Sequence, residues 1–210
     1  MLADRAIDYI GEVLASGVLS GMRVGAPDGG KFLQLLEGEF RAMFGAPYAV
    51  AVNSATSGLH AALVAAGVGR GDTVLVPAIT MMATAAAVVH AGARPYFVDV
   101  DPTTGLITEA TTARALETYD GMVPPVAVMP VHLFGAVAET AHNLRIIEDC
   151  AQAPGSVDPE GHFAGLLGDA GVFSLNQHKV IQCGEGGVIL TRSKEIYERA
   201  RLVRNHGENH

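Results

Sequence analysis

Short apolar stretches alternate with longer helix-like stretches from Tyr48 to the end of the chain. The short stretches are rich in residues that favour β-structure, and each is of the length expected for a strand. We predict strands at 48–52, 73–76, 94–98, 126–131, 144–147, 171–173 and 188–190.

The longer stretches carry helix signals at their ends, since several follow Ser or Thr and stop near Gly. We predict helices at 33–44, 56–66, 80–91, 108–116 and 194–204. Strands that alternate with helices indicate an α/β domain, in which helical crossovers connect the strands of one sheet. No internal repeat or low-complexity linker interrupts this alternation.

The composition fits one large domain with an aliphatic core. Of the 210 residues, 49% are hydrophobic and 17% are charged, and there is no Trp. Such a chain is long enough to bury a sizeable core. Alanine runs such as 85–87 suit helices that pack closely on a sheet.

Charge and hydropathy exclude several classes of partner. The net charge of −8 and the pI near 5.4 argue against nucleic acid and anionic membranes, because both recruit cationic surfaces. The longest apolar stretches, such as 81–91, are shorter than the roughly 20 residues of a membrane span. The N-terminus lacks the residue order of a signal peptide, so we expect a cytoplasmic protein. Two cysteines, Cys150 and Cys183, are too few for a disulfide scaffold, and we expect both to be buried thiols.

Two features are unusual for a complete α/β protein. The predicted strands ending near Val131 and beginning near Leu144 leave little room for the parallel crossover, which usually needs at least about 10 to 12 residues. The chain also ends directly after a predicted helix, without a second, smaller domain.

The first segment with candidate chemistry is 173–179, which ends at Lys179 and precedes the glycine-rich stretch 184–187. A lysine in a turn between two strands can be held against a ligand. A single lysine in a glycine-rich loop is nevertheless usually a solvated surface charge, because lysine is rarely buried unpaired. Lys179 therefore gains meaning only together with other residues.

Two further segments add candidate ligand contacts. Asp149 follows the apolar stretch 144–147, and a carboxylate at that end of a strand can hold a pyridine nitrogen protonated. Thr56 and Ser57 open a predicted helix directly after a strand, where free N–H groups and hydroxyls suit a phosphate. Ordinary helix capping is the simpler alternative for both segments.

A phosphate site, a pyridinium partner and an aldehyde-binding lysine, in this order, are what pyridoxal phosphate requires. In these segments the chain resembles the sugar aminotransferases of the DegT/DnrJ/EryC1/StrS type, which are fold type I pyridoxal-phosphate enzymes. The resemblance runs from about Leu14 to the end and includes the stretches 71–77, 97–102, 130–135 and 202–207. It implies an aspartate-aminotransferase-like large domain, a three-layer α/β sandwich with a mostly parallel seven-stranded sheet. Residues 1–30 would form an N-terminal arm or helix and residues 31–210 the cofactor-binding domain, with the small C-terminal domain absent.

The resemblance also implies roles for the residues around the ring. Lys179 would form the internal Schiff base and later act as the base, Asp149 would pair with the pyridine nitrogen, and Gln152 would lie near the phenolic oxygen. In this family a frequently aromatic residue covers the face of the ring, and Met81 occupies that position here. A thioether can still pack on an aromatic ring.

The phosphate contacts follow in the same way. The resemblance places Ser174 beside Thr56 and Ser57 on the phosphate. His132 and His178 are more plausible as structural histidines than as catalytic ones, and the remaining histidines share no metal-ligand spacing with the cysteines, so we expect no metal site.

The implied reaction transfers an amino group from glutamate or glutamine to a keto-sugar or keto-cyclitol. Active sites of this family lie between two subunits, so we expect a homodimer, or a heteromer with a chain that supplies the missing domain. Two alternatives remain open at this point. The chain could be a non-catalytic partner of an active paralogue, or a sugar dehydratase, although some relatives that dehydrate sugars carry His at the position of Lys179.

Overall fold

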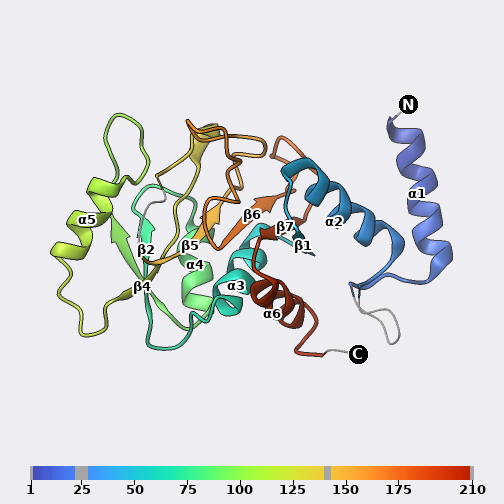
Figure 1. Ribbon diagram of the computed structural model, residues 1–210. Coiled ribbons are helices and arrows are strands. Elements are labelled where there is room, and N and C mark those ends of the chain that lie inside the picture. Colours follow the sequence, from blue (N-terminus) through green and yellow to red (C-terminus); the bar gives the residue numbers. More distant parts are fainter. Residues whose placement is uncertain (1, 22–27, 140–142, 209–210) are drawn as a thin grey trace.

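The computed structural model describes residues 2–21, 28–139 and 143–208, and it places one seven-stranded sheet between two layers of helices (Figure 1). The strands are β1 (Tyr48–Val52), β2 (Thr73–Pro77), β3 (Arg94–Val98), β4 (Pro125–Val128), β5 (Arg145–Asp149), β6 (Ala170–Ser174) and β7 (Gly187–Thr191). Each predicted strand is confirmed, with ends that differ by up to three residues.

The sheet is mostly parallel, with the strand order β1-β7-β6-β5-β4-β2-β3. Five strands, β3, β2, β4, β5 and β6, run parallel to their neighbours in this order. Only β7 runs antiparallel to both of its neighbours, β6 and β1. The loop between β6 and β7 therefore leaves and re-enters the sheet at the same end of the two strands.

The helices are α1 (Leu2–Ser16), α2 (Lys31–Phe44), α3 (Ala55–Ala65), α4 (Met82–His90), α5 (Glu109–Glu117) and α6 (Lys194–Arg204). Side-chain caps explain where several of them begin. Ser54 caps α3 by accepting from the Ser57 N–H, and Thr108 forms a reciprocal capping box with Thr111 at the start of α5. These caps confirm the sequence signals within one or two residues.

Alternation along the strands divides the core between the two faces of the sheet. Val74, Val172 and Ile189 point to the face that α3, α4 and α6 cover. Their neighbours Leu75 and Phe173 point to the opposite face, which α2, α5 and the loops cover. The predicted three-layer sandwich is confirmed.

The N-terminal helix α1 stands beside this sandwich rather than within it (Figure 1). Its contacts run to α2, with the Tyr9 and Phe32 rings 5.1 Å apart and a Lys31–Glu12 ion pair of 2.8 Å. Ile10 and Leu14 on α1 remain exposed.

The sequence interpretation needs correction at two places. The strand predicted at 126–131 ends at Val128, and Val131 forms only an isolated bridge to Asp149. Cys183 is exposed rather than buried, because it lies in the loop after β6, whereas Cys150 is buried as expected.

The connection from β4 to β5 contains a short 3-10 turn, Leu133–Gly135, and no α-helix in its described part; residues 140–142 lie outside the description. Within the described ranges, no helix is both long and apolar enough to span a bilayer.

Candidate active site

A cavity of about 390 Å³ opens where the carboxyl ends of β5 and β6 meet the N-termini of α3 and α4. Ligands of open α/β sheets bind at this edge. Six of the predicted residues line the cavity, namely Thr56, Met81, Asp149, Gln152, Ser174 and Lys179. The structure therefore brings together segments that are more than 100 residues apart in the sequence.

Asp149 is the last residue of β5 and is 5% exposed. Its Oδ2 accepts from the Thr84 hydroxyl at 2.8 Å and its Oδ1 accepts from the Ala151 N–H at 3.1 Å. Burial raises the pKa of this carboxyl, and the hydrogen bonds from Thr84 and Ala151 together with the charge of Lys179 oppose that shift. Among the described residues no cation forms an ion pair with Asp149.

Lys179 lies in the loop between β6 and β7, and its backbone N–H donates to the Asn176 carbonyl at 2.9 Å. The Asn176 side chain forms two hydrogen bonds within the same loop. Its Nδ2 donates to Glu185 at 2.6 Å, and its Oδ1 accepts from the His178 N–H at 3.1 Å. Ser174, at the end of β6, accepts from the Asn176 N–H at 3.3 Å. The lysine is thus presented by a loop with defined internal bonds.

The start of α3 forms the opposite wall. Thr56 lies in the first turn, where backbone N–H groups have no intrahelical partner. Gly187 at the start of β7 allows this close approach, because a side chain there would lie 2.8 Å from the Ala55 nitrogen. The dipole of α3 consequently points its positive end into the cavity.

Ser57 does not lie with the other predicted residues. Its hydroxyl bonds to Asn53 and Ser54, and its N–H is taken by the Ser54 cap. It lines a different cavity, together with His60 and Arg204. Thr56 and Ser57 line different cavities because neighbouring residues on a helix point about 100° apart.

Gln152 and Met81 lie at the sides of the cavity. The Gln152 Oε1 accepts from the Phe134 N–H at 3.0 Å, which leaves its amide N–H groups for another partner. Met81 is the N-cap residue of α4 and is 67% exposed. Its thioether can therefore contact a ligand without rearrangement of the core.

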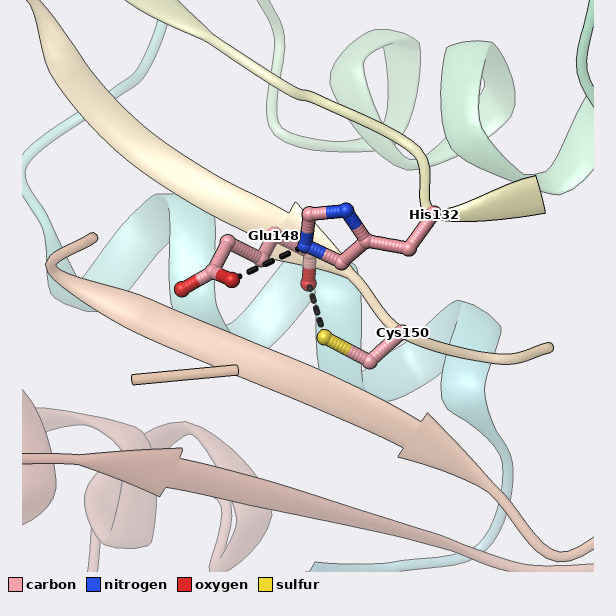
Figure 2. Close-up of side chains that lie close together, drawn as sticks. All are labelled: His132, Glu148 and Cys150. Carbon is pink, nitrogen blue, oxygen red and sulfur yellow. Dashed lines mark hydrogen bonds and ion pairs between the residues drawn. The ribbon is translucent and has the colours of Figure 1, made fainter. Parts of the chain in front are cut away.

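Beside Asp149, a buried cluster joins His132, Glu148 and Cys150 (Figure 2). His132 Nε2 lies 2.9 Å from Glu148 Oε2, and His132 Nδ1 accepts from the Ala138 N–H at 3.0 Å. Because Nδ1 is an acceptor, the proton is on Nε2 and points to the carboxylate. The Cys150 thiol points to the backbone carbonyl of Glu148 at 3.9 Å.

Glu148 also accepts three backbone N–H groups, from Gly165, Leu167 and Gly168, at 2.6 to 2.9 Å. Four donors thus surround one fully buried carboxylate. We interpret the cluster as a structural network that ties the segments after β4 and β5 together, because its ligand atoms are already used in hydrogen bonds.

Sequence reasoning missed Thr80, Thr84, Asn176 and Glu185. Thr80, Asn176 and Glu185 line the cavity, and the buried Thr84 hydroxyl donates a hydrogen bond to Asp149. The periodicity of the alanine-rich helix α4 gave no signal for Thr84, since a buried threonine matches the apolar pattern. His178, expected to be structural, lines the cavity as well.

Comparison with known proteins finds several relatives that match most of this chain. The chain is 39% identical over 186 residues to GDP-perosamine synthase of Caulobacter vibrioides, covering 85% of this chain and 48% of that protein. It is 40% identical over 172 residues to L-glutamine:2-deoxy-scyllo-inosose aminotransferase of Streptomyces fradiae, covering 78% and 39%.

Solved structures agree. An aminotransferase from Psychrobacter cryohalolentis superposes with a TM-score of 0.84 at 32% identity, covering 97% of this chain and 51% of that one. NtdA from Bacillus subtilis, solved with bound cofactor PMP, gives a TM-score of 0.76 at 25% identity, covering 94% and 43%. The chain therefore spans about half the length of the proteins it matches. The model of the DegT/DnrJ/EryC1/StrS aminotransferase family matches residues 8–210, and the chain belongs to this family.

Proposed function

We propose that this chain forms the cofactor-binding part of an aminotransferase that moves an amino group from glutamate or glutamine to a keto-sugar or keto-cyclitol. Family membership supports the reaction class, and the names of the relatives support the substrate class. The observation that carries the proposal is the convergence of Asp149, Lys179 and the start of α3 on one cavity. The cofactor is pyridoxal phosphate.

The cavity fits this cofactor in three respects. Its volume of about 390 Å³ lies in the range of small-molecule sites. Asp149 is a buried carboxylate without a cationic partner among the described residues, and a protonated pyridine nitrogen would supply one. The N-terminus of α3, with the Thr56 and Ser174 hydroxyls, offers donors for a phosphate.

The bound cofactor supplies an electron sink for the carbanion that forms at the donor's α-carbon. Asp149 would keep the ring nitrogen protonated. Gln152, with its oxygen fixed by Phe134, would donate through Nε2 to the phenolic oxygen. Lys179 would hold the cofactor covalently and, once displaced by the donor's amine, would carry the α-proton on Nζ. Met81 would cover one face of the ring.

Exposed apolar side chains directly follow three residues that line the cavity, namely Met81, Leu133 and Lys179, and they support the proposal of a second subunit. Met82 after β2, Phe134 after β4 and Val180 after Lys179 are each more than 80% exposed. Apolar groups of this size rarely gather on a monomer's surface. We propose a homodimer, or a heteromer with a chain that provides the part of the relatives this chain does not span. The division into an arm at 1–30 and a large domain at 31–210, and a cytoplasmic location, belong to the same proposal.

Absorbance tests the proposal directly. Purified chain mixed with pyridoxal phosphate should develop the visible band of a lysine-bound cofactor, and Lys179→Ala should lose it. Lys194→Ala is the matched control, because Lys194 is an exposed lysine on α6. A wild-type chain that stays without the band, or a band that survives in Lys179→Ala, would refute the assignment.

A second assay separates the reaction classes. With a keto-sugar substrate, turnover that requires glutamate or glutamine supports transamination. Turnover without a donor would favour a dehydratase. Activity that appears only after an active paralogue is added, and persists in Lys179→Ala, would identify a non-catalytic partner.

A further inference from the structure

Asp149 receives its only side-chain hydrogen bond within the described part of the chain from Thr84. Thr84 is fully buried in the first turn of α4, and its Oγ1 lies 2.8 Å from Asp149 Oδ2. Behind it, the Thr80 Oγ1 lies 2.9 Å from the Thr84 Oγ1. The three side chains form a line from the wall of the cavity, through the base of α4, to the end of β5.

The direction of these hydrogen bonds follows from the number of protons. An ionised carboxylate only accepts, so the single hydroxyl proton of Thr84 must point to Asp149. The Thr84 oxygen can then only accept from Thr80, which must donate. Each hydroxyl polarises the next, and this strengthens the bond that reaches the carboxylate.

We propose that Thr84, with Thr80 behind it, is the positioning residue that keeps Asp149 ionised and directs its free lone pairs into the cavity. The proposal rests on the proposed function for the identity of the ligand, but its effect on Asp149 exists without any ligand. Burial opposes the charge on Asp149, and Thr84 is the largest of the influences that counteract this effect. A hydrogen bond to the charged form of an acid favours that form.

Other charged or titratable groups face Asp149, and their contributions differ from that of Thr84. Lys179 lowers the pKa of Asp149 through its charge but donates no hydrogen bond to it, and His132 directs its Nε2 proton to Glu148. Glu148 and Cys150 flank it in the sequence, with the Glu148 carboxylate surrounded by its own four donors. Only Thr84 and the Ala151 N–H fix the orientation of the carboxyl group among the described residues.

The same arrangement links two walls of the cavity. Thr80 lines the cavity directly, and Met81, which caps α4, follows it in the chain. Because Thr84 joins the first turn of α4 to β5, the position of Met81 relative to Asp149 is fixed by the same hydrogen bonds. A loss of the Thr84 hydroxyl should therefore change both the charge and the geometry of the site.

Four variants of the full chain test the proposal. Thr84→Val removes the hydroxyl at nearly constant shape, and Thr84→Ser restores it. Thr112→Val is the control, because Thr112 is also fully buried but its hydroxyl has no partner in the described residues. Thr80→Val removes only the distal donor, and it replaces Thr84→Val if that variant does not fold.

The first measurement needs no cofactor. Carbon NMR of the side-chain carboxyl groups, with the Asp149 signal assigned from Asp149→Asn, gives the pKa of Asp149. We expect an increase of about one pH unit in Thr84→Val, a smaller increase in Thr80→Val, and wild-type values in Thr84→Ser and Thr112→Val. An Asp149 pKa that is unchanged in both valine variants at positions 84 and 80 would overturn the proposal.

The second measurement is the affinity for pyridoxal phosphate as a function of pH. Thr84→Val should bind about tenfold more weakly near neutral pH, and Thr84→Ser should recover most of this loss. If wild-type chain binds no cofactor while the pKa of Asp149 still rises in Thr84→Val, the proposed function fails and the role of Thr84 stands. If Thr84→Ser binds as weakly as Thr84→Val, the hydroxyl is not the cause and the inference is wrong.

Discussion

Four hydrogen-bond donors converge on the carboxylate of Glu148, so the effect of replacing this carboxylate with an amide can be predicted. Its Oε2 accepts from His132 Nε2 and the Gly165 N–H, and its Oε1 accepts from the Leu167 and Gly168 N–H groups. Glu148→Gln keeps the shape of the side chain but replaces one acceptor oxygen with an NH₂ group. That group must face two donors, whichever way the amide is turned.

A change of tautomer at His132 does not relieve this conflict. If His132 Nε2 became an acceptor, Nδ1 would carry the proton and would then oppose the Ala138 N–H that it now accepts from at 3.0 Å. The least costly arrangement keeps the amide oxygen on His132 and Gly165, which are fully buried, and turns NH₂ toward Leu167 and Gly168, which are half-buried.

Two lost acceptor contacts at half-buried donors cost about 1 to 2 kcal/mol each, so we expect Glu148→Gln to lower the free energy of unfolding by about 2 to 4 kcal/mol. Removal of a buried charge offsets part of the loss, which is why the estimate takes the lower end of the usual range. For a chain of this size the melting temperature should fall by roughly 5 to 15 °C.

Urea and thermal unfolding, followed by circular dichroism, measure this change. Glu198→Gln is the control, since Glu198 is an exposed residue with a 3.5 Å ion pair to Lys194, and it should change stability by less than about 0.5 kcal/mol. If Glu148→Gln unfolds at the same midpoint as the control, the four-donor arrangement does not stabilise the fold as described.

Two further predictions concern packing and pH. Gly171→Ala should lower the free energy of unfolding in urea by about 3 kcal/mol, because the new Cβ would overlap the backbone of Gly165. Gly69→Ala is the control, since a Cβ at Gly69 meets open space and should leave the stability nearly unchanged. Equal unfolding midpoints for the two variants would contradict this packing. Burial raises the pKa values of Asp149 and Glu37, so the folded chain holds these protons to higher pH than the unfolded chain does. Their contribution is fully present below their ordinary values of 3.8 and 4.5 and is lost as the pH rises through the raised values. Relative to Asp149→Asn, the wild-type chain without cofactor should therefore become less stable as the pH rises above the ordinary Asp149 value of 3.8, and a constant difference would refute this reasoning.

Local patterns were sufficient to predict the strands and most helix ends, whereas the residues expected at the cofactor came from the resemblance to the family. Strands of a buried sheet are predicted from short apolar runs, and Asp149 is the last residue of one such strand, whereas Lys179 lies five residues beyond the end of β6. Thr84 was not predictable, because its role depends on α4 packing against the end of β5, and no local pattern encodes that contact. Glu148 was missed for the same reason, since its partners lie up to 20 residues away in loops.

Two other expectations differ from the structure for another reason. The resemblance implied that Ser57 contacts the phosphate, whereas in the structure Ser57 lines a different cavity from Thr56. Cys183 was expected to be buried from the average behaviour of cysteine, but it belongs to the loop that projects from the sheet. In both cases the direction of the side chain depends on the three-dimensional fold, which a local sequence pattern does not specify.

The antiparallel course of β7 has a consequence for how variants of this protein should be interpreted. The loop that carries Lys179 is clamped at both ends, because Ser174 and Gly187 are direct partners across the ladder. A residue inserted near Val180 would leave both strands paired, and lengthening a surface loop costs little free energy, about 0.6 kcal/mol for a full doubling. Such a chain would express and melt normally while its lysine no longer reached the cavity. Screens that score only yield or melting temperature would thus miss the changes that matter most in this segment.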